Sequence, residues 1–285
     1  MTEARNEAPA LARLLAALPP RPMHALGQLL GLLLYLVSGR FRRHTKANLA
    51  LALPDAGLGR RLAVSAGAGS SALEGVRVLT RPAAESKARV REAVGWDAVE
   101  TALATGHGVM LISPHLGCFE IVGPWGSKHP ITALYRPNRN RIVQSLIEYG
   151  RRRYAQLAPV DRTGVRALLS ALKRAEVVLL LPDQVPDAGE GVWEPFFGRP
   201  AYTMTLAARL SEVPKVKTFM YCGEILPRGV GFRMHFLEPD PPLAGDTRAR
   251  VAAISRNFEK LALRLPEQYL WGYNRYKTPR GVDPP

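Results

Sequence analysis

The sequence has little cysteine: its 285 residues include only Cys118 and Cys222, which lie far apart in the chain. There is no CxxC pair and no larger cluster of cysteine and histidine. Structural zinc sites and disulfide frameworks need such groupings, so the sequence argues against both. We therefore expect both cysteines to be buried thiols in a reducing compartment.

Three widespread catalytic motifs are also missing, namely the GxSxG elbow, the P-loop and the HExxH pair. Their absence argues against common serine hydrolases, P-loop enzymes and zinc peptidases. Gly67 to Ala72 matches the Ala-ended dinucleotide fingerprint, but that motif must follow a hydrophobic strand. The preceding residues 59–64 include two adjacent arginines, so small residues in a closely packed helix explain the segment better.

Acidic residues are scarce beside basic ones, with 24 Asp and Glu against 39 Lys and Arg. The formal net charge is +15 and the pI is about 10.3. This surplus predicts an anionic partner, which nucleic acid, a membrane surface or an acidic protein would each provide. The sequence has no recognition-helix pattern and no platform of alternating aromatic and basic residues, so we expect no nucleic-acid partner.

Formal charge is absent from the stretch between Pro22 and Gly39. As a helix this stretch would span about 27 Å at 1.5 Å per residue, close to the hydrocarbon core of about 30 Å. A buried core helix is the alternative, and His24 and Gln28 favour it. The basic flank favours a membrane anchor, because such residues mark the cytoplasmic, anionic-lipid side. The flank consists of Arg40, Arg42, Arg43 and Lys46.

The residues before the uncharged stretch support the same hypothesis. Leucines and one arginine in residues 11–18 could form a short amphipathic companion helix. A cleaved signal peptide fits poorly, because Glu3 and Glu7 lie where a signal peptide carries positive charge. We expect an N-terminal membrane anchor with its basic flank over residues 1–45 and one catalytic domain over residues 46–285 that faces the cytoplasm.

Short apolar runs alternate with helical patterns in the larger part of the chain. The runs that we expect to form buried strands are residues 108–113, 131–135, 176–181, 215–221 and 231–237. The segments that we expect to form helices are residues 47–54, 58–79, 116–125, 139–157, 163–174, 203–212 and 247–265. This alternation predicts an α/β fold with a mostly parallel central sheet flanked by helices.

The strongest chemical signal is the segment from Ser113 to Glu120, SPHLGCFE. His115 directly follows an expected strand, and open α/β sheets place their chemistry beyond the carboxyl ends of strands. If the loop turns sharply, the Glu120 carboxylate reaches one imidazole nitrogen and leaves the other free as a general base. A purely structural histidine is the alternative. Because no serine or cysteine nucleophile is well placed, the pair predicts activation of a hydroxyl group.

Arginines gather in residues 135–141 and 150–153, and Arg136 and Arg151 belong to these groups. Arg162 follows shortly after them. They fit either a solvated helix face or a cradle for phosphate groups, which arginine binds bidentately. Asp183 follows another expected strand, where it could cap a turn or pair with one of the arginines.

Taken in order, these segments resemble the late (secondary) acyltransferases of bacterial lipid A biosynthesis, within the HX4D/E acyltransferase group. The His-x4-acid spacing alone is common by chance, whereas the ordered set is specific. The matching segments are residues 48–54, 115–120, 135–140, 150–151, 161–162, 182–183, 194–203, 266–271 and 275–278.

The resemblance implies that a His–acid pair deprotonates a hydroxyl, which then attacks an acyl thioester. Carried over, His115 is the base and Glu120 its partner, while Arg151 and Asp183, and less strongly Arg136 and Arg162, contribute to phosphate binding or site architecture. The sequence departs from many members at residues 118–119, Cys-Phe instead of Asn-Trp, and at residues 273–274, Tyr-Asn instead of His-Arg. These departures leave the acyl length and the acceptor open.

The resemblance also implies the partners and the location. The acyl donor is usually carried on acyl carrier protein, and the acceptor is a phosphorylated glucosamine disaccharide lipid. We expect no metal and no redox cofactor, and we expect the cytoplasmic face of the bacterial inner membrane, with its anionic lipids, as the location. The alternative is a related acyltransferase that draws on acyl-CoA and acts on a lysophospholipid, a phosphoinositide mannoside or an ornithine lipid.

Overall fold

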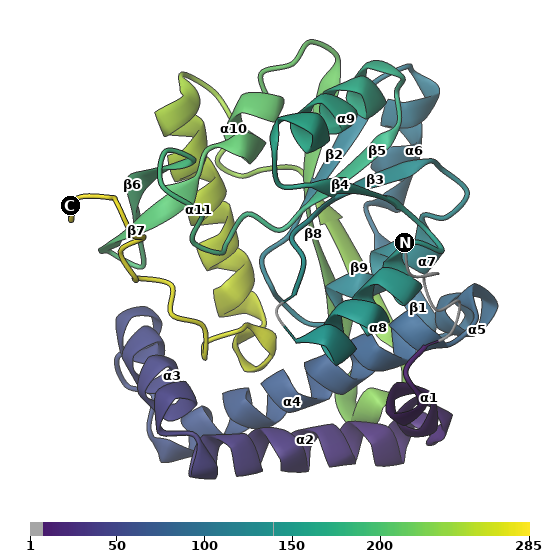
Figure 1. The fold of residues 1–285 in the computed structure, drawn as a ribbon, viewed down its shortest axis with the longest axis vertical. Helices are drawn as coiled ribbons and strands as arrows, with labels where there is room; N and C mark the ends of the chain where they lie inside the picture. The colour runs from purple at the N-terminus through teal and green to yellow at the C-terminus, as the bar shows by residue number, and fades with distance from the viewer. Residues whose placement is uncertain (1–7, 139) are drawn as a thin grey trace.

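The computed structural model describes residues 8–138 and 140–285 (Figure 1). Glu3 and Glu7, which argue against a signal peptide, lie outside the described residues, and so does Arg139 at the start of one expected helix.

A seven-stranded sheet forms the centre, in the spatial order β1-β9-β8-β2-β5-β3-β4. Neighbouring strands are parallel throughout, except for the antiparallel pair β8 and β9. This confirms the predicted α/β class with a mostly parallel sheet. The strands are β1 (Val90–Val94), β2 (Gly108–Ile112), β3 (Ile131–Tyr135), β4 (Gln156–Pro159), β5 (Val177–Leu180), β8 (Val216–Ile225) and β9 (Phe232–Leu237).

The central strands are visible in the sequence because they are covered on both faces. Every residue of β2, GVMLI, and of β5, VVLL, is buried, as expected for parallel strands between two helical layers. Met110 and Ile112 face one apolar core, while Val109 and Leu111 face the other. The two layers of helices therefore follow from the alternation of side chains along β2.

One face of the sheet is covered by α9 (Arg162–Lys173), α10 (Leu206–Leu210) and α11 (Thr247–Arg264). The other face is covered by α6 (Trp96–Ala104) and α7 (Val122–Trp125). A separate hairpin of β6 (Gly191–Phe196) and β7 (Arg199–Met204) packs near α11. Its two-residue turn has positive φ at both Phe197 and Gly198, the geometry that suits the twist of a hairpin.

The N-terminal helices form a layer of their own along one end of the molecule (Figure 1). The long helices α2 and α4 lie side by side, and α8 packs on α4 from the other side. The elements of this part are α1 (Ala10–Ala17), α2 (Pro20–Val37), α3 (Gly39–Ala52), α4 (Leu58–Thr80), α5 (Ala83–Ala88) and α8 (Arg141–Arg151).

The expected anchor stretch coincides with α2. Among the described residues, no single helix has the length and apolarity to cross a membrane by itself, although α2 and α3 meet the criterion as a pair bent by 98°.

One expected helix, residues 116–125, is wrong in its first half. Helical structure begins only with the single turn η1 (Phe119–Ile121) and continues into α7. Gly117 has φ +59°, and its N–H donates to Gln268 O, while the N–H of Cys118 donates to Gly223 O. These bonds to distant segments hold residues 116–118 in a non-helical loop. The remaining short turns are η2 (Pro227–Gly229) and η3 (Pro266–Gln268).

Two other expected helices are shorter than predicted. The segment 139–157 divides into α8 and the edge strand β4, and the segment 203–212 begins inside β7. Both are places where a strand borders a helix, and the apolar pattern alone does not locate that border.

Candidate active site

The register of two neighbouring strands brings a histidine and an aspartate together. In the pairing of β2 with β5, Ile112 lies opposite Leu180. His115 lies three residues after Ile112, and Asp183 lies three residues after Leu180. Because the two strands are parallel, both residues lie at the same edge of the sheet. His115 Nδ1 lies 2.5 Å from Asp183 Oδ1, and the backbone N–H of His115 donates to Asp183 Oδ2 over 2.8 Å.

Asp183 is buried, and its surroundings keep it ionised. Burial by itself would raise its pKa, but the charge and hydrogen bonds of His115, with a contribution from Arg275, hold the pKa of Asp183 below its ordinary value. The ionised carboxylate accepts a hydrogen bond from Nδ1–H of His115. This arrangement assigns the lone pair of the neutral imidazole to Nε2.

The amide of Gln184 faces that second nitrogen. Its Nε2 lies 3.3 Å from His115 Nε2, so the amide N–H is the donor when the imidazole is neutral. The ring of Phe119 stands edge-on to the imidazole, with the ring centroids 5.2 Å apart. The backbone N–H of Leu270 donates to the carbonyl of His115, which connects this loop to the C-terminal segment.

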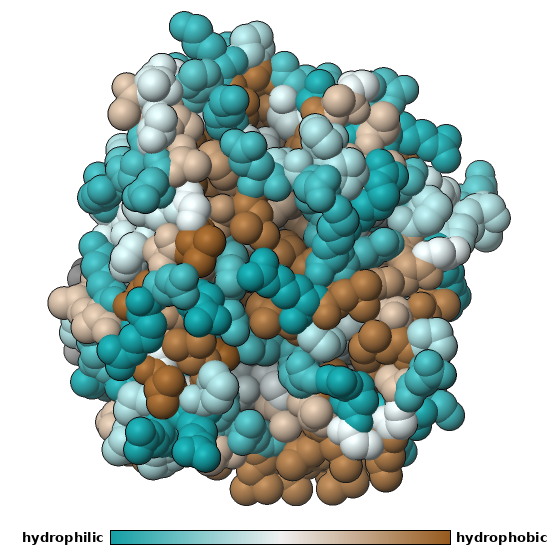
Figure 2. Space-filling view, turned by 180° about the vertical axis from the view of Figure 1, so that it is seen from behind, coloured by the Kyte–Doolittle hydropathy of each residue, from teal (hydrophilic) through white to brown (hydrophobic). Residues whose placement is uncertain are grey.

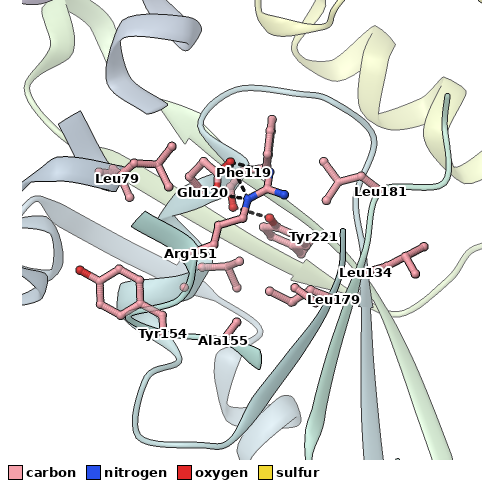
Figure 3. A pocket seen from close by; sticks show the side chains of 14 residues that line it. Leu79, Phe119, Glu120, Leu134, Arg151, Tyr154, Ala155, Leu179, Leu181 and Tyr221 are labelled. Carbon is pink, nitrogen blue, oxygen red and sulfur yellow. Dashed lines mark hydrogen bonds and ion pairs between the residues drawn. The ribbon is translucent and has the colours of Figure 1, made fainter. Parts of the chain in front are cut away.

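Glu120, which the sequence assigns to His115, has a different partner in the structure. Its carboxylate receives three hydrogen bonds from Arg151 at the end of α8, at 2.7–3.1 Å (Figure 3). The predicted contact between Glu120 and His115 requires a sharp turn of the loop. Instead, the hydrogen bonds of Gly117 and Cys118 to distant segments hold this loop so that Glu120 points toward α8. The carboxylate that orients His115 is therefore Asp183.

Arg151 is held in a largely buried position by Glu120 and by aromatic rings. Burial would lower its pKa, but the charge and hydrogen bonds of Glu120 outweigh this and raise the pKa of Arg151, so the guanidinium stays charged. Its carbon lies 5.8 Å from the ring centroid of Tyr135 and 6.0 Å from that of Phe119. Tyr221 donates a hydrogen bond to the carbonyl of Phe119 (Figure 3). This cluster supports the aromatic ring that packs on His115.

A cavity of about 380 Å³ lies beside His115, between α4 and α8. Its walls are mainly small or apolar, and Glu120 is the only acid among the described residues that line it. The lining residues are Ala68, Ser71, Ala72, Gly75, Val76, Leu79, His115, Gly117, Cys118, Phe119, Glu120, Val143, Leu146, Ile147, Gln268 and Leu270. The histidine therefore stands at the wall of a mainly apolar space of the kind that holds a hydrocarbon chain.

The structure places the other two predicted arginines farther along the carboxyl edge. Arg136 follows β3 and forms ion pairs with Asp187 at 3.1 Å and Glu190 at 3.9 Å. Arg162 begins α9 and lines a separate cavity of about 800 Å³. In the described part of the chain, no hydrogen bond or ion pair joins either arginine to His115 or Asp183.

The motifs at the two ends of the chain meet near the site. The side-chain amide of Asn48, on α3, donates to the carbonyls of Trp271 and Tyr273 at 2.7 and 2.8 Å. The hydroxyl of Tyr273 accepts a hydrogen bond from the N–H of Val185, two residues beyond Asp183. Within residues 8–138 and 140–285, no group of three or more His, Cys, Asp or Glu side chains is arranged to hold a metal ion.

The fold and site together define a class: an α/β protein that carries a carboxylate-oriented histidine beside an apolar cavity. The comparison with protein families then gives the identity at family level. The profile described as "Bacterial lipid A biosynthesis acyltransferase" matches residues 9–278, so the chain belongs to that family.

Individual relatives carry related names. The chain is 30% identical to the lipid A biosynthesis lauroyltransferase of Escherichia coli over 200 residues, which cover 68% of this chain and 65% of that protein. It is 29% identical to the palmitoleoyltransferase of the same organism, over 65% of this chain and 60% of the relative. A lipid A biosynthesis acyltransferase of Haemophilus influenzae is 25% identical, over 63% and 57%. The matched segments thus span less than two thirds of these relatives' lengths.

Proposed function

We propose that this protein is an O-acyltransferase that moves a fatty acyl group from an acyl thioester to a hydroxyl of a lipid A precursor. The observation that carries the proposal is the pairing of His115 with buried Asp183 at the wall of the apolar cavity. Family membership and the names of the relatives support lipid A as the acceptor class.

In the proposed mechanism, His115 is the general base. Nε2 accepts the proton of the acceptor hydroxyl while the hydroxyl oxygen attacks the thioester carbon. The tetrahedral intermediate then collapses, the C–S bond breaks, and the departing sulfur takes the proton from Nε2. The products are an ester and a free thiol. Asp183 stabilises the imidazolium that exists between the two proton transfers.

Gln184 belongs to the same proposal. An acceptor hydroxyl that binds to His115 Nε2 enters the space that the Gln184 amide faces. There the amide N–H is placed to donate to the hydroxyl oxygen or to the developing oxyanion. Donors of this kind, aimed at developing charge, contribute strongly to acyl transfer.

Glu120 and Arg151 act as positioning residues in this account. Two nitrogens of the Arg151 guanidinium donate hydrogen bonds to Glu120. Arg151 therefore has a structural role: it supports Phe119, which packs against the imidazole. Arg136 and Arg162 lie on the exposed carboxyl edge and are the candidates for contact with phosphate groups of the donor or acceptor.

The partners and location complete the proposal. The donor is carried on acyl carrier protein, whose acidic surface matches the net charge of +15. No metal and no redox cofactor take part, since proton transfer and thioester chemistry need neither. The enzyme works at the cytoplasmic face of the bacterial inner membrane, where a lipid acceptor is found.

The test is an assay of purified protein with acyl-acyl carrier protein and an under-acylated lipid A precursor. We expect an added ester-linked acyl chain in the product, detected by mass spectrometry. His115→Gln should reduce kcat by at least about 10²-fold, the usual contribution of a general base. Acyl-CoA as donor, and a lysophospholipid or an ornithine lipid as acceptor, serve as the comparison substrates.

A His115→Gln protein as active as the wild type would contradict the mechanism. Transfer that occurs only to a comparison acceptor would contradict the substrate class while it leaves the chemistry intact.

A further inference from the structure

One face of α2 is in direct backbone contact with α4. Gly27 and Gly31 lie on this face, and a Cβ atom at Gly31 would stand 2.0 Å from the carbonyl oxygen of Ser65. A Cβ atom at Gly69 of α4 would likewise stand 2.0 Å from the carbonyl oxygen of Gly27. Such close approach is possible only between small residues. Helix α2 is therefore held along α4, with its axis beside the body of the protein.

The opposite face of α2 is apolar and exposed. Its side chains are between 44% and 79% accessible: Leu29, Leu30, Leu33, Leu34, Leu36 and Val37. Leu11 and Leu14 of α1 are exposed as well. Figure 2 shows the resulting apolar patch along the end of the molecule that α2 forms. A continuous apolar surface of this kind marks a site of contact with another phase or another molecule.

Charge complementarity identifies the partner. Residues 8–54 contain no Asp or Glu, but they include five arginines and one lysine. Arg21 is exposed at the start of α2, and Arg40, Arg42, Arg43 and Lys46 are exposed where α3 bends away. Arg42 donates to the carbonyls of Tyr35 and Leu36, which keeps its guanidinium beside the apolar face. An apolar face bordered by cations alone matches an anionic lipid surface.

We infer that α1 and α2 dock on an anionic bilayer with α2 lying along the membrane surface. The exposed apolar face of α2 enters the boundary between headgroups and acyl chains, while the arginines of α3 contact the headgroups. The cavity beside His115 lies on the other side of α4 from α2, because α4 both lines the cavity wall and packs against α2. Packed helix axes lie about 8–10 Å apart. The cavity beside His115 is thus a single helical layer away from the membrane.

This inference deepens the proposed membrane location and rests on the proposed function only in connecting the membrane with a lipid acceptor. Binding to vesicles is measured without acyl donor or acceptor. A failure of docking and a failure of acyl transfer are therefore separate results.

The binding experiment uses the full chain and vesicles of phosphatidylethanolamine and phosphatidylglycerol, with phosphatidylcholine vesicles as the neutral comparison. Leu30→Ser/Leu33→Ser should lower the partition coefficient at least about tenfold on both kinds of vesicle. Arg40→Gln/Arg43→Gln should lower it about thirtyfold on the anionic vesicles alone. Leu263→Ser changes an exposed leucine of α11 and should bind like the wild type. Equal binding by all four proteins would overturn the inference.

Depth measurements test the orientation. Cys118 and Cys222 are buried, so a spin label reacts selectively with a cysteine introduced at Leu29→Cys, Leu33→Cys or Val37→Cys. A helix along the surface gives all three labels the same shallow depth by power saturation. A regular gradient from deep to shallow along the three positions would show that α2 crosses the bilayer, and it would overturn the inference.

Discussion

At the scale of single residues, the proposed mechanism depends on which carboxylate faces His115. Asp183 is bonded to both the imidazole and the backbone N–H of His115, so it fixes the ring in one orientation. Glu120 neutralises a buried arginine instead. In the proposed mechanism the two acids therefore have separable effects: Asp183 takes part in the chemistry and Glu120 supports the site.

Asp183→Asn and its matched control Glu120→Gln should separate these roles. We expect Asp183→Asn to lower kcat by about 10²–10⁴-fold, because the imidazolium loses its counter-charge and the tautomer is no longer fixed. Glu120→Gln should instead lower the free energy of unfolding by about 1–3 kcal/mol, since Arg151 loses its partner in a largely buried place. Kinetics and urea unfolding measure the two effects.

The pH dependence of stability follows from the lowered pKa of Asp183. A carboxylate with a lowered folded-state pKa stabilises the fold above its unfolded pKa of about 3.9. That contribution is lost as the pH falls through the lowered value. The stability difference between the wild type and Asp183→Asn should therefore shrink between neutral and strongly acidic pH. A difference that is constant with pH, or a larger kinetic loss in Glu120→Gln than in Asp183→Asn, would contradict this assignment.

Gln184 gives a second prediction at this scale. Gln184→Ala removes the N–H donor and should lower kcat by about 10²-fold, the scale of one oxyanion donor. Gln184→Glu places a carboxylate near Nε2, which favours the protonated imidazole and should move the acid limb of kcat/KM to higher pH. The pH profiles of both variants measure this. An unchanged kcat in Gln184→Ala would show that the amide takes no part.

At the scale of elements, the sequence predicts the central strands and long helices well, because their patterns are local. Continuous apolar runs identify β2 and β5, whereas β1 is half exposed and only one residue of β4 is buried, so neither of these two has a distinctive pattern. The pairing of His115 with Asp183 depends on which strands are neighbours, and no local pattern gives that order. The equal offset of both residues from their strand ends is the signal that points to the pair.

The error at Glu120 has a physical origin at the same scale. The expected helix over residues 116–125 follows helical spacing. The observed conformation of Gly117 and Cys118 depends on bonds to Gln268 and Gly223, which lie more than 100 residues away. Tertiary hydrogen bonds override the local pattern there.

The contact of α2 with α4 gives the prediction at the element scale. Gly31→Val places a branched side chain where even a Cβ atom meets the Ser65 carbonyl, so the helices must separate. We expect a loss of about 1–3 kcal/mol or more. Gly39→Ala is the control, because a Cβ atom at Gly39 meets nothing within 4 Å. Thermal unfolding in detergent measures both, and equal stability of the two variants would contradict the close contact.

At the scale of the whole molecule, the surplus of positive charge is distributed over several parts of the surface. Part of it borders the exposed apolar face of α2, where a membrane is the proposed partner. Arg136 and Arg162 lie along the carboxyl edge of the sheet, beyond the His115 site. In the proposed function, the partners of these basic residues are a membrane lipid and an acidic carrier protein rather than nucleic acid.

The most direct test of the central claim is the mass of lipid A from cells with and without this protein. Cells without it should make lipid A that lacks one acyl chain, and the missing mass identifies the chain length. The wild-type gene should restore the chain, and His115→Gln should not. Identical lipid A in both cells, or full restoration by His115→Gln, would contradict the account.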